Sequence, residues 1–175
     1  MRIALGSDGR SHVTDFVEQE LRRRGFEVQL LGALQDQPQS VSTSAWPDVA
    51  QAVAESVASG RADCGVVFCW TGTGVSIAAN KVPGIRAALC GDAETARGAK
   101  AWNQANVLCL SLRALSESVA AEVLDAWLSA SPDPGEVENV SKLNRLDERY
   151  RPARPSGAPV RSVSLPGGRK GVSSG

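Results

Sequence analysis

The chain has 175 residues, of which 19 are basic and 19 acidic, so its formal net charge is zero. This balance gives no reason to expect a nucleic acid or an anionic membrane as a partner. The length suits one domain with a hydrophobic core, and no apolar stretch approaches the roughly 20 residues that a membrane-spanning helix needs.

Strand and helix patterns alternate along the chain. Short apolar runs predict strands over residues 2–7, 26–31, 63–69, 85–90 and 107–110. Apolar residues at helical spacing predict helices over residues 13–24, 47–59, 74–81, 92–103 and 116–129. The alternation predicts an α/β fold, namely a Rossmann-like three-layer α/β/α sandwich around a five-stranded parallel sheet.

The remaining segments are polar. Residues 35–45 have the composition of a loop, and residues 136–150 have that of one more helix. Residues 151–175 are rich in Pro, Gly, Ser and Arg without apolar periodicity, which predicts a flexible tail. Its basic residues could touch an anionic partner, although a solvated tail is the simpler interpretation. We therefore expect one domain over residues 1–150 and a tail over 151–175.

The few cysteine and histidine residues restrict the possible chemistry. Four cysteines lie in or beside apolar runs, at positions 64, 69, 90 and 109, and His12 is the one histidine. The cysteine spacing matches neither a metal site nor a small secreted disulfide framework, so we expect reduced thiols in a cytoplasm. We expect no metal, since one histidine leaves too few ligands for a histidine-based metal site. We also expect no cofactor.

Cys69 ends an apolar predicted strand, and a loop of Thr and Gly follows it before the next helix. Ligands in parallel α/β sheets bind at the carboxyl ends of strands. A thiol there, facing free backbone N–H groups, indicates acid–base or nucleophilic chemistry on an anionic substrate. The other three cysteines are expected to be small packing residues.

Five motifs occur in one order and spacing: residues 3–8, 69–74, 76–81, 84–87 and 103–107. On these residues the chain resembles the ribose-5-phosphate isomerase B and galactose-6-phosphate isomerase family, over residues 1–130 and more weakly to 150. The resemblance implies an aldose–ketose isomerase that acts on a sugar phosphate or a related small polyol. It also implies a cis-enediolate intermediate and no metal.

The resemblance implies roles for the loop residues. Cys69 falls on the base that moves a proton between two carbons, and Thr71 is the second predicted catalytic residue. Gly72, Thr73 and Gly74 fall on the loop whose N–H groups face the enediolate. These residues are therefore expected to contact the substrate.

Other binding residues come from several parts of the chain. Asp8 falls on a sugar-binding aspartate, and Ser76 is a further candidate for substrate contact. Asn103 falls on an asparagine that reaches the site from a neighbouring subunit, which implies a homodimer or tetramer with shared active sites. Arg145, with Arg149 nearby, is the candidate for holding the phosphate.

Three positions depart from the family pattern. Trp70 follows the cysteine where relatives have glycine. Gly9 stands where relatives carry a histidine that binds phosphate and the ring oxygen, and His12 could replace it if the loop shifts. Trp102 stands where the ribose enzymes carry a ring-opening histidine. Trp70 and Trp102 would together give the site an aromatic wall, and both are predicted to contact substrate.

Three functions remain open on the sequence. The first is an isomerase of a sugar phosphate with a cysteine base. The second is a repurposed relative that uses the same thiol and loop on a different, more apolar substrate. The third is a partner subunit that needs a relative bearing the missing histidine. The departures predict poor turnover of cyclic pentose phosphates and a preference for an open-chain or aromatic-bearing ligand.

Overall fold

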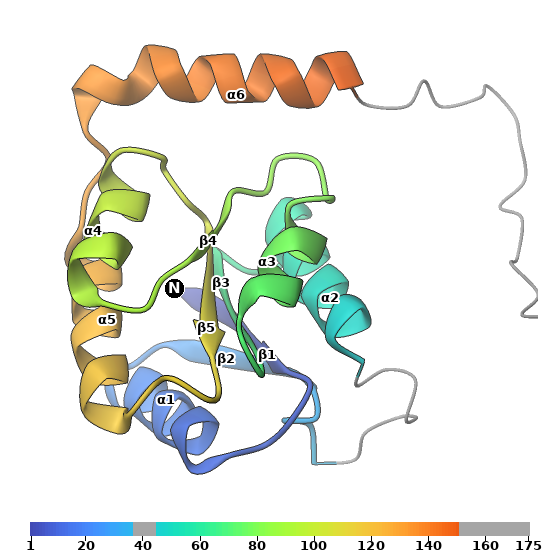
Figure 1. The fold of residues 1–175 in the computed structure, drawn as a ribbon, viewed down its shortest axis with the longest axis vertical. Helices are drawn as coiled ribbons and strands as arrows, with labels where there is room; N and C mark the ends of the chain where they lie inside the picture. Colours follow the sequence, from blue (N-terminus) through green and yellow to red (C-terminus); the bar gives the residue numbers. More distant parts are fainter. Residues whose placement is uncertain (37–44, 151–175) are drawn as a thin grey trace, which may run out of the picture.

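Five parallel strands form the centre of the molecule in a computed structural model that describes residues 1–36 and 45–150 (Figure 1). The strands are β1 (Arg2–Ser7), β2 (Glu27–Gly32), β3 (Cys64–Cys69), β4 (Ala87–Leu89) and β5 (Val107–Ser111). Their order is β2-β1-β3-β5-β4, and every neighbouring pair is parallel. The predicted α/β class is confirmed.

Helices cover both faces of the sheet (Figure 1). They are α1 (His12–Arg23), α2 (Trp46–Ala58), α3 (Thr73–Ala79), α4 (Ala93–Ala101), α5 (Glu117–Ser129) and α6 (Val137–Tyr150). Helices α1, α4 and α5 bury Phe68 and Trp127 on one face, whereas α2 and α3 bury Val67 and Val75 on the other. The apolar residues of the buried strands face these two cores alternately, as the pleat requires.

The connections leave β1 in opposite directions. Helix α1 leads from β1 to β2 over one face, and α2 leads back from β2 to β3 over the other face. The topological switch point, where such folds bind ligands, therefore lies between β1 and β3. Ser7 pairs with Phe68 in the sheet, so Asp8, the first residue after β1, and Cys69, the last residue of β3, follow adjacent positions at this point.

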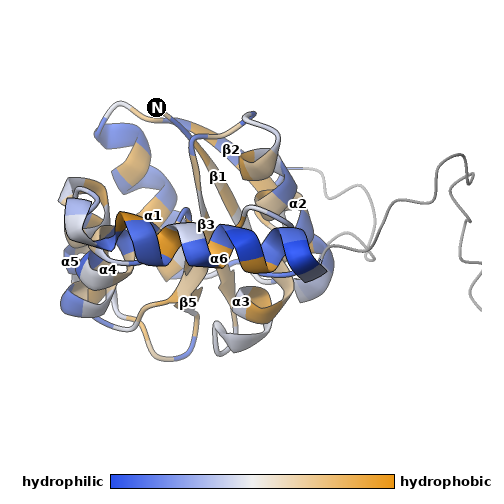
Figure 2. Cartoon of the chain, turned by 90° about the horizontal axis from the view of Figure 1, so that it is seen from above, coloured by the Kyte–Doolittle hydropathy of each residue, from blue (hydrophilic) through white to orange (hydrophobic). Residues whose placement is uncertain are grey.

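Helix α6 lies across the amino ends of the strands, opposite the carboxyl ends where the switch point lies (Figures 1 and 2). The Asp147 carboxylate accepts a hydrogen bond of 2.8 Å from the backbone N–H of Gly84 and so ties α6 to the loop before β4. Leu143 and Leu146 remain 43% and 46% exposed on this helix. Helix α6 therefore has apolar surface that the described part of the chain leaves uncovered.

Two predicted elements were too long. The strand predicted over residues 85–90 is only Ala87–Leu89. The Asn80 side chain bonds the N–H of Ala87 at 2.9 Å and its C=O at 2.8 Å, so a side chain occupies part of the edge of β4. The helix predicted to Asn103 ends at Ala101, because the chain turns sharply at the next residues.

Some predictions lie outside the described residues. Most of the loop predicted over 35–45 and the whole tail over 151–175 belong to this group. The division into a domain and a tail thus stays a prediction. Among the described residues, no helix is long and apolar enough to span a membrane, and no three His, Cys, Asp or Glu side chains gather in an arrangement for a metal ion.

Candidate active site

Cys69 lies at the carboxyl end of β3 on the face covered by α2 and α3, and 5% of its surface is exposed. Its carbonyl oxygen accepts hydrogen bonds from the N–H of Leu112 at 3.0 Å and of Gly72 at 3.3 Å. The first bond joins the thiol-bearing residue to the segment that follows β5. The second closes the tight turn that begins the Thr/Gly loop.

The next peptide is held in the same way. The carbonyl oxygen of Trp70 accepts a bond from the Ser111 hydroxyl at 2.9 Å and from the Arg113 N–H at 3.2 Å. The Trp70 side chain itself is 66% exposed. The backbone of the loop is therefore fixed at the sheet edge, while an indole ring projects beside the buried thiol.

Gly72 allows the loop to lie close to β5. Its φ of +75° is in the left-handed region, which side chains other than glycine adopt at a cost. A Cβ atom here would lie 2.5 Å from Leu89 Cδ1 and 3.0 Å from the Leu110 carbonyl. The hydroxyls of Thr71 and Thr73 lie on either side, 2.7 Å apart and exposed at the edge.

Asp8 enters the site from β1. Ser11, not Asp8, caps helix α1, because its hydroxyl accepts the Thr14 N–H while the Thr14 hydroxyl accepts the Ser11 N–H. The carboxyl group of Asp8 is thus left at the switch point. Burial raises the pKa of Asp8 above its usual range, and a bond to its own backbone N–H acts in the opposite direction.

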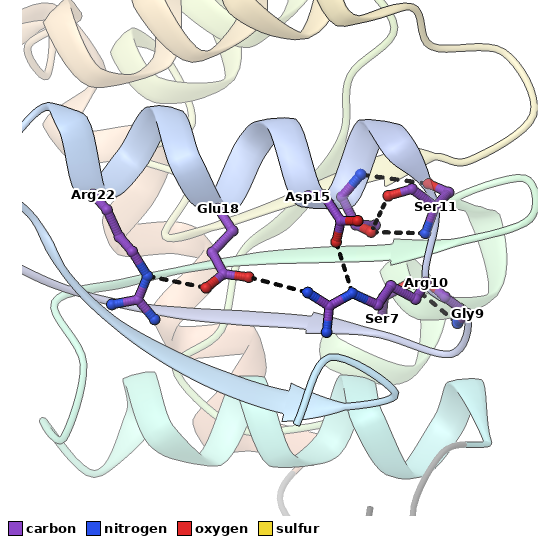
Figure 3. A network of polar contacts seen from close by, with 8 residues as sticks. Ser7, Gly9, Arg10, Ser11, Asp15, Glu18 and Arg22 are labelled. Atoms are coloured by element: carbon purple, nitrogen blue, oxygen red, sulfur yellow. Dashed lines mark hydrogen bonds and ion pairs between the residues drawn. The ribbon is translucent and has the colours of Figure 1, made fainter. Parts of the chain in front are cut away.

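The loop between Asp8 and α1 is tied down (Figure 3). Arg10 pairs with Asp15 at 2.8 Å and with Glu18 at 3.9 Å, so its guanidinium lies along α1. His12 is exposed in the first turn of that helix. Any shift that carried His12 towards Cys69 would have to break the Arg10 pairs or the Ser11 cap.

Ser76 faces inwards. Its hydroxyl donates a hydrogen bond of 3.4 Å to the carbonyl oxygen of Ala87 on β4. Gly74, two residues earlier, lies beneath the ring of Trp46, since a Cβ atom there would be 3.0 Å from Trp46 Cε3. These two loop candidates therefore contact the protein, and substrate would have to reach Gly74 through its backbone.

The remaining candidates lie at the other edge of the sheet. Helix α4 runs back from the carboxyl edge, so Trp102 and Asn103 lie near the amino ends of the strands. Asn103 lines a cavity of about 340 Å³ together with Arg86 and α6, the helix that also carries Arg145. Within one chain the fold thus brings Asp8, Cys69 and the loop together and leaves these three residues apart from them.

The other three cysteines are buried thiols whose surroundings disfavour the thiolate. Burial raises the pKa of Cys90 to about 11, with the nearby charge of Asp92 adding to the effect. Burial also raises the pKa of Cys64 and of Cys109. These three thiols stay protonated near neutral pH, which agrees with their predicted role in packing.

Arg113 is a candidate that sequence reasoning missed. It follows β5 at the same edge as Cys69, its side chain is exposed, and it pairs with no acidic side chain among the described residues. It lines a cavity of about 340 Å³ together with Thr71, Leu89 and Cys90. A cation directly after an apolar strand was the available signal, because that position belongs to the ligand-binding edge.

A thiol and a carboxyl group at the switch point of a parallel sheet, with a cation after the neighbouring strand β5, are typical of a site for small anionic molecules. The family model described as Ribose/Galactose Isomerase matches residues 3–146. Ribose-5-phosphate isomerase B of Escherichia coli K12 is 35% identical over 153 residues, which are 85% of this chain and 97% of that protein. D-erythrulose-4-phosphate isomerase of Pectobacterium atrosepticum is 33% identical over 158 residues, which are 86% of this chain and 98% of that protein.

Solved structures agree with these matches. The structure of Clostridium thermocellum ribose-5-phosphate isomerase B aligns with a TM-score of 0.76 at 36% identity, covering 86% of this chain and 99% of that one. This chain belongs to the ribose/galactose isomerase family and is by class an aldose–ketose isomerase.

Proposed function

We propose that this protein interconverts an aldose phosphate and a ketose phosphate that exist as open chains. The observation that carries the proposal is the placement of Cys69 and Asp8 at the carboxyl ends of the adjacent strands β3 and β1, beside a fixed loop. The thiol and loop support proton transfer between two carbons. His12, the histidine described at this end of the sheet, is held in the first turn of α1 behind the Ser11 cap and the Arg10 pairs, which argues against a ring-opening step through it.

In the proposed reaction Cys69 acts as a thiolate base. It removes the proton from the carbon beside the carbonyl group, and the C–H electron pair becomes the carbon–carbon double bond of a cis-enediolate. The carbonyl oxygen gains the negative charge, which the backbone N–H groups of Thr71, Thr73 and Gly74 stabilise, since that of Gly72 already donates to the Cys69 carbonyl oxygen. The proton of the second oxygen's hydroxyl group then passes to this oxyanion, the second oxygen becomes the new carbonyl group, and the pair of the carbon–carbon double bond takes the proton back from the thiol at the former carbonyl carbon. The thiolate is restored, and the isomerisation leaves no net change in protons or electrons.

Asp8 and Arg113 hold the two ends of the substrate in this proposal. The carboxylate of Asp8 accepts hydrogen bonds from sugar hydroxyls beside the reacting carbons. The guanidinium of Arg113 attracts the phosphate, and its exposed position beside Thr71 supports that role. Both groups lie at the same edge of the sheet as the thiol.

Four-carbon sugar phosphates are the substrate class that fits best. In a tetrose 4-phosphate, the hydroxyl that would close a five-membered ring carries the phosphate, so the sugar stays open. Such a substrate needs no acid–base group for ring opening, and Trp102 at the position of the family's histidine costs it nothing. The similarity to a relative named D-erythrulose-4-phosphate isomerase supports this choice.

A second copy of the chain completes the site in this proposal. Trp102 is 58% exposed, and Asn103 lies beside it at the edge of the sheet that is remote from Cys69 of the same chain. The exposed Leu143 and Leu146 on α6 offer apolar surface for a partner. A homodimer or tetramer would bring this edge to a neighbour's thiol, together with Arg145. Four free thiols suit the cytoplasm as its location.

The test is proton exchange with solvent. Wild-type protein with D-erythrulose 4-phosphate in deuterated water should place deuterium on C1 of the ketose and on C2 of the aldose product, as proton NMR would show. The Cys69→Ala variant should place none. Isomerisation that continues at the wild-type rate in this variant would exclude the cysteine base. Failure of the wild type on every sugar phosphate would favour the repurposed relative.

A further inference from the structure

Arg86 stabilises the turn that follows α4 through hydrogen bonds of its side chain and its backbone. Its Nε donates a hydrogen bond of 2.9 Å to the carbonyl oxygen of Gln104. Its backbone N–H donates to Asn106 Oδ1 at 2.8 Å, and its carbonyl oxygen accepts the Asn106 N–H at 3.0 Å. The side chain is half-buried, and burial lowers the pKa of the guanidinium while the charge of Asp147 opposes that shift.

The turn that Arg86 holds is strained. Gln104 has a φ of +48° and is the one residue other than glycine with a positive φ among the described residues. Such a backbone persists only where the surrounding contacts enforce it, and it is concentrated at functional sites. Arg86 supplies one enforcing contact, and Lys100 supplies another, a bond of 3.4 Å from its Nζ to the Ala105 carbonyl.

The turn presents side chains to the outside. Trp102 is 58% exposed, and Asn103 is also exposed. Neither side chain belongs to the hydrophobic cores of this chain. Arg86 therefore does more than fill space in the protein. It fixes the strained backbone that presents the exposed side chains of Trp102 and Asn103.

We infer that Arg86 is a positioning residue for the active site of the neighbouring subunit, because it sets the turn that carries Trp102 and Asn103. This inference rests on the proposed function, in which these two residues complete a site built on the partner's thiol. Arg86 thus acts in trans: it lies near the amino ends of the strands, far from Cys69 of its own chain.

The first test measures the turn itself. Arg86→Met removes the bond to Gln104, and amide hydrogen exchange at residues 102–106 should accelerate about tenfold or more because local opening becomes easier. Exchange at residues 69–74 should stay unchanged. Arg97→Met is the matched control, since Arg97 is an exposed arginine on α4 that pairs only with Glu94. Unchanged exchange at 102–106 in Arg86→Met would overturn the inference.

The second test separates action in trans from a general structural role. Arg86→Met should lower kcat by about 10²-fold, as misplacement of a site by an ångström does. Cys69→Ala should be inactive. Co-expression of the two variants gives mixed dimers in which one site has an intact thiol from one chain and an intact turn from the other. Half of the dimers are mixed on random pairing and each holds one good site, so activity should return to roughly a quarter of the wild-type value.

The outcomes are distinct. No turnover by the wild type would reject both the proposed function and this inference. An active wild type whose mixed variants stay inactive would reject the inference alone, since Arg86 would then act within its own site. Arg86→Lys serves as a second variant if Arg86→Met does not fold, because it keeps the charge and loses the Nε donor. Return of activity in the mixture supports positioning in trans.

Discussion

The indole ring of Trp102 lies against the α-carbon of Gly98, one helical turn earlier on α4. A Cβ atom at position 98 would be 2.5 Å from Trp102 Cζ3 and 2.7 Å from Cε3. Only the missing side chain of Gly98 leaves room for the ring in this place. The direction in which Trp102 projects from the protein therefore depends on a glycine inside a helix.

The Gly98→Ala variant should separate stability from activity. Alanine favours the helix by about 1 kcal/mol over glycine, and the new methyl group displaces the flexible Trp102 ring. We expect a melting temperature equal to or above that of the wild type and a kcat/KM lowered about tenfold, since misplaced contacts cost rate. In a Trp102→Ala background the same change should leave kcat/KM unchanged. A loss of activity of equal size in both backgrounds would contradict a role through Trp102.

The Trp102→His variant should gain activity on a cyclic substrate. An imidazole at this position supplies the acid–base group that the resemblance implies for ring opening, and general acid–base catalysis contributes about 10²–10⁴-fold. Turnover of ribose 5-phosphate should rise accordingly, while turnover of D-erythrulose 4-phosphate should not rise. Steady-state assays on both substrates measure this. Equal gains on both would mean that Trp102 blocks the site for a different reason.

Cys69→Ala should abolish turnover while the fold remains intact. Removal of a general base costs about 10²–10⁴-fold in rate, and the raised pKa values of the other three thiols keep them protonated, so that they do not take its place. Cys64→Ala is the matched control, because it makes the same change at the opposite end of β3. Circular dichroism and steady-state rates on both variants decide the matter. Loss of activity in both would point to damage to the sheet.

Much of the fold could be predicted because it depends on local pattern. The apolar runs and helical spacings that define β1, β3 and α5 are continuous in the sequence, and so the parallel sandwich followed from them. The short β4 could not be seen in this way. The side chain of Asn80 bonds the backbone of Ala87, seven positions later, and the hydropathy pattern does not encode a side chain that occupies a strand edge.

The candidate site was predictable where it follows the end of a strand. Asp8 and Cys69 could be found because strand ends mark the ligand-binding edge of a parallel sheet. Arg113 obeys the same rule and was overlooked. Arg86 could not have been found, since its importance lies in a bond to the carbonyl group of Gln104, 18 positions later, and in the strained φ of that residue.

Gly72→Ala should destabilise the protein more than Gly60→Ala does. Both glycines have a φ of +75°, so both variants carry the cost of a left-handed alanine, about 1–2 kcal/mol. Gly60 has no atom within 4 Å of the new Cβ, whereas at Gly72 the new Cβ meets Leu89 and the backbone of Leu110. Urea unfolding of both variants should show the larger loss at position 72. Equal losses in the free energy of unfolding would mean that the loop around residue 72 accommodates the new methyl group without further destabilisation.

The Asp8→Asn variant tests the pH dependence of stability. Burial raises the pKa of Asp8, so the folded state binds the proton more tightly than the unfolded chain does. The stability that this proton binding adds to the folded state is therefore fully present below the ordinary aspartate pKa of about 3.9. It is lost as the pH rises through the raised pKa. In thermal melting from pH 3 to 7, the melting temperature of Asp8→Asn should rise relative to that of the wild type as the pH increases. A gain with decreasing pH would contradict the raised pKa.

The comparison of two substrates on wild-type protein tests the proposed function most directly. Steady-state kcat/KM would be measured for D-erythrulose 4-phosphate, which is always open, and for D-ribose 5-phosphate, which is mostly a ring. An enzyme with Cys69 and Asp8 but with Trp102 in place of the ring-opening histidine should prefer the four-carbon substrate by about 10²-fold or more. A kcat/KM for ribose 5-phosphate equal to or above that for D-erythrulose 4-phosphate would contradict it.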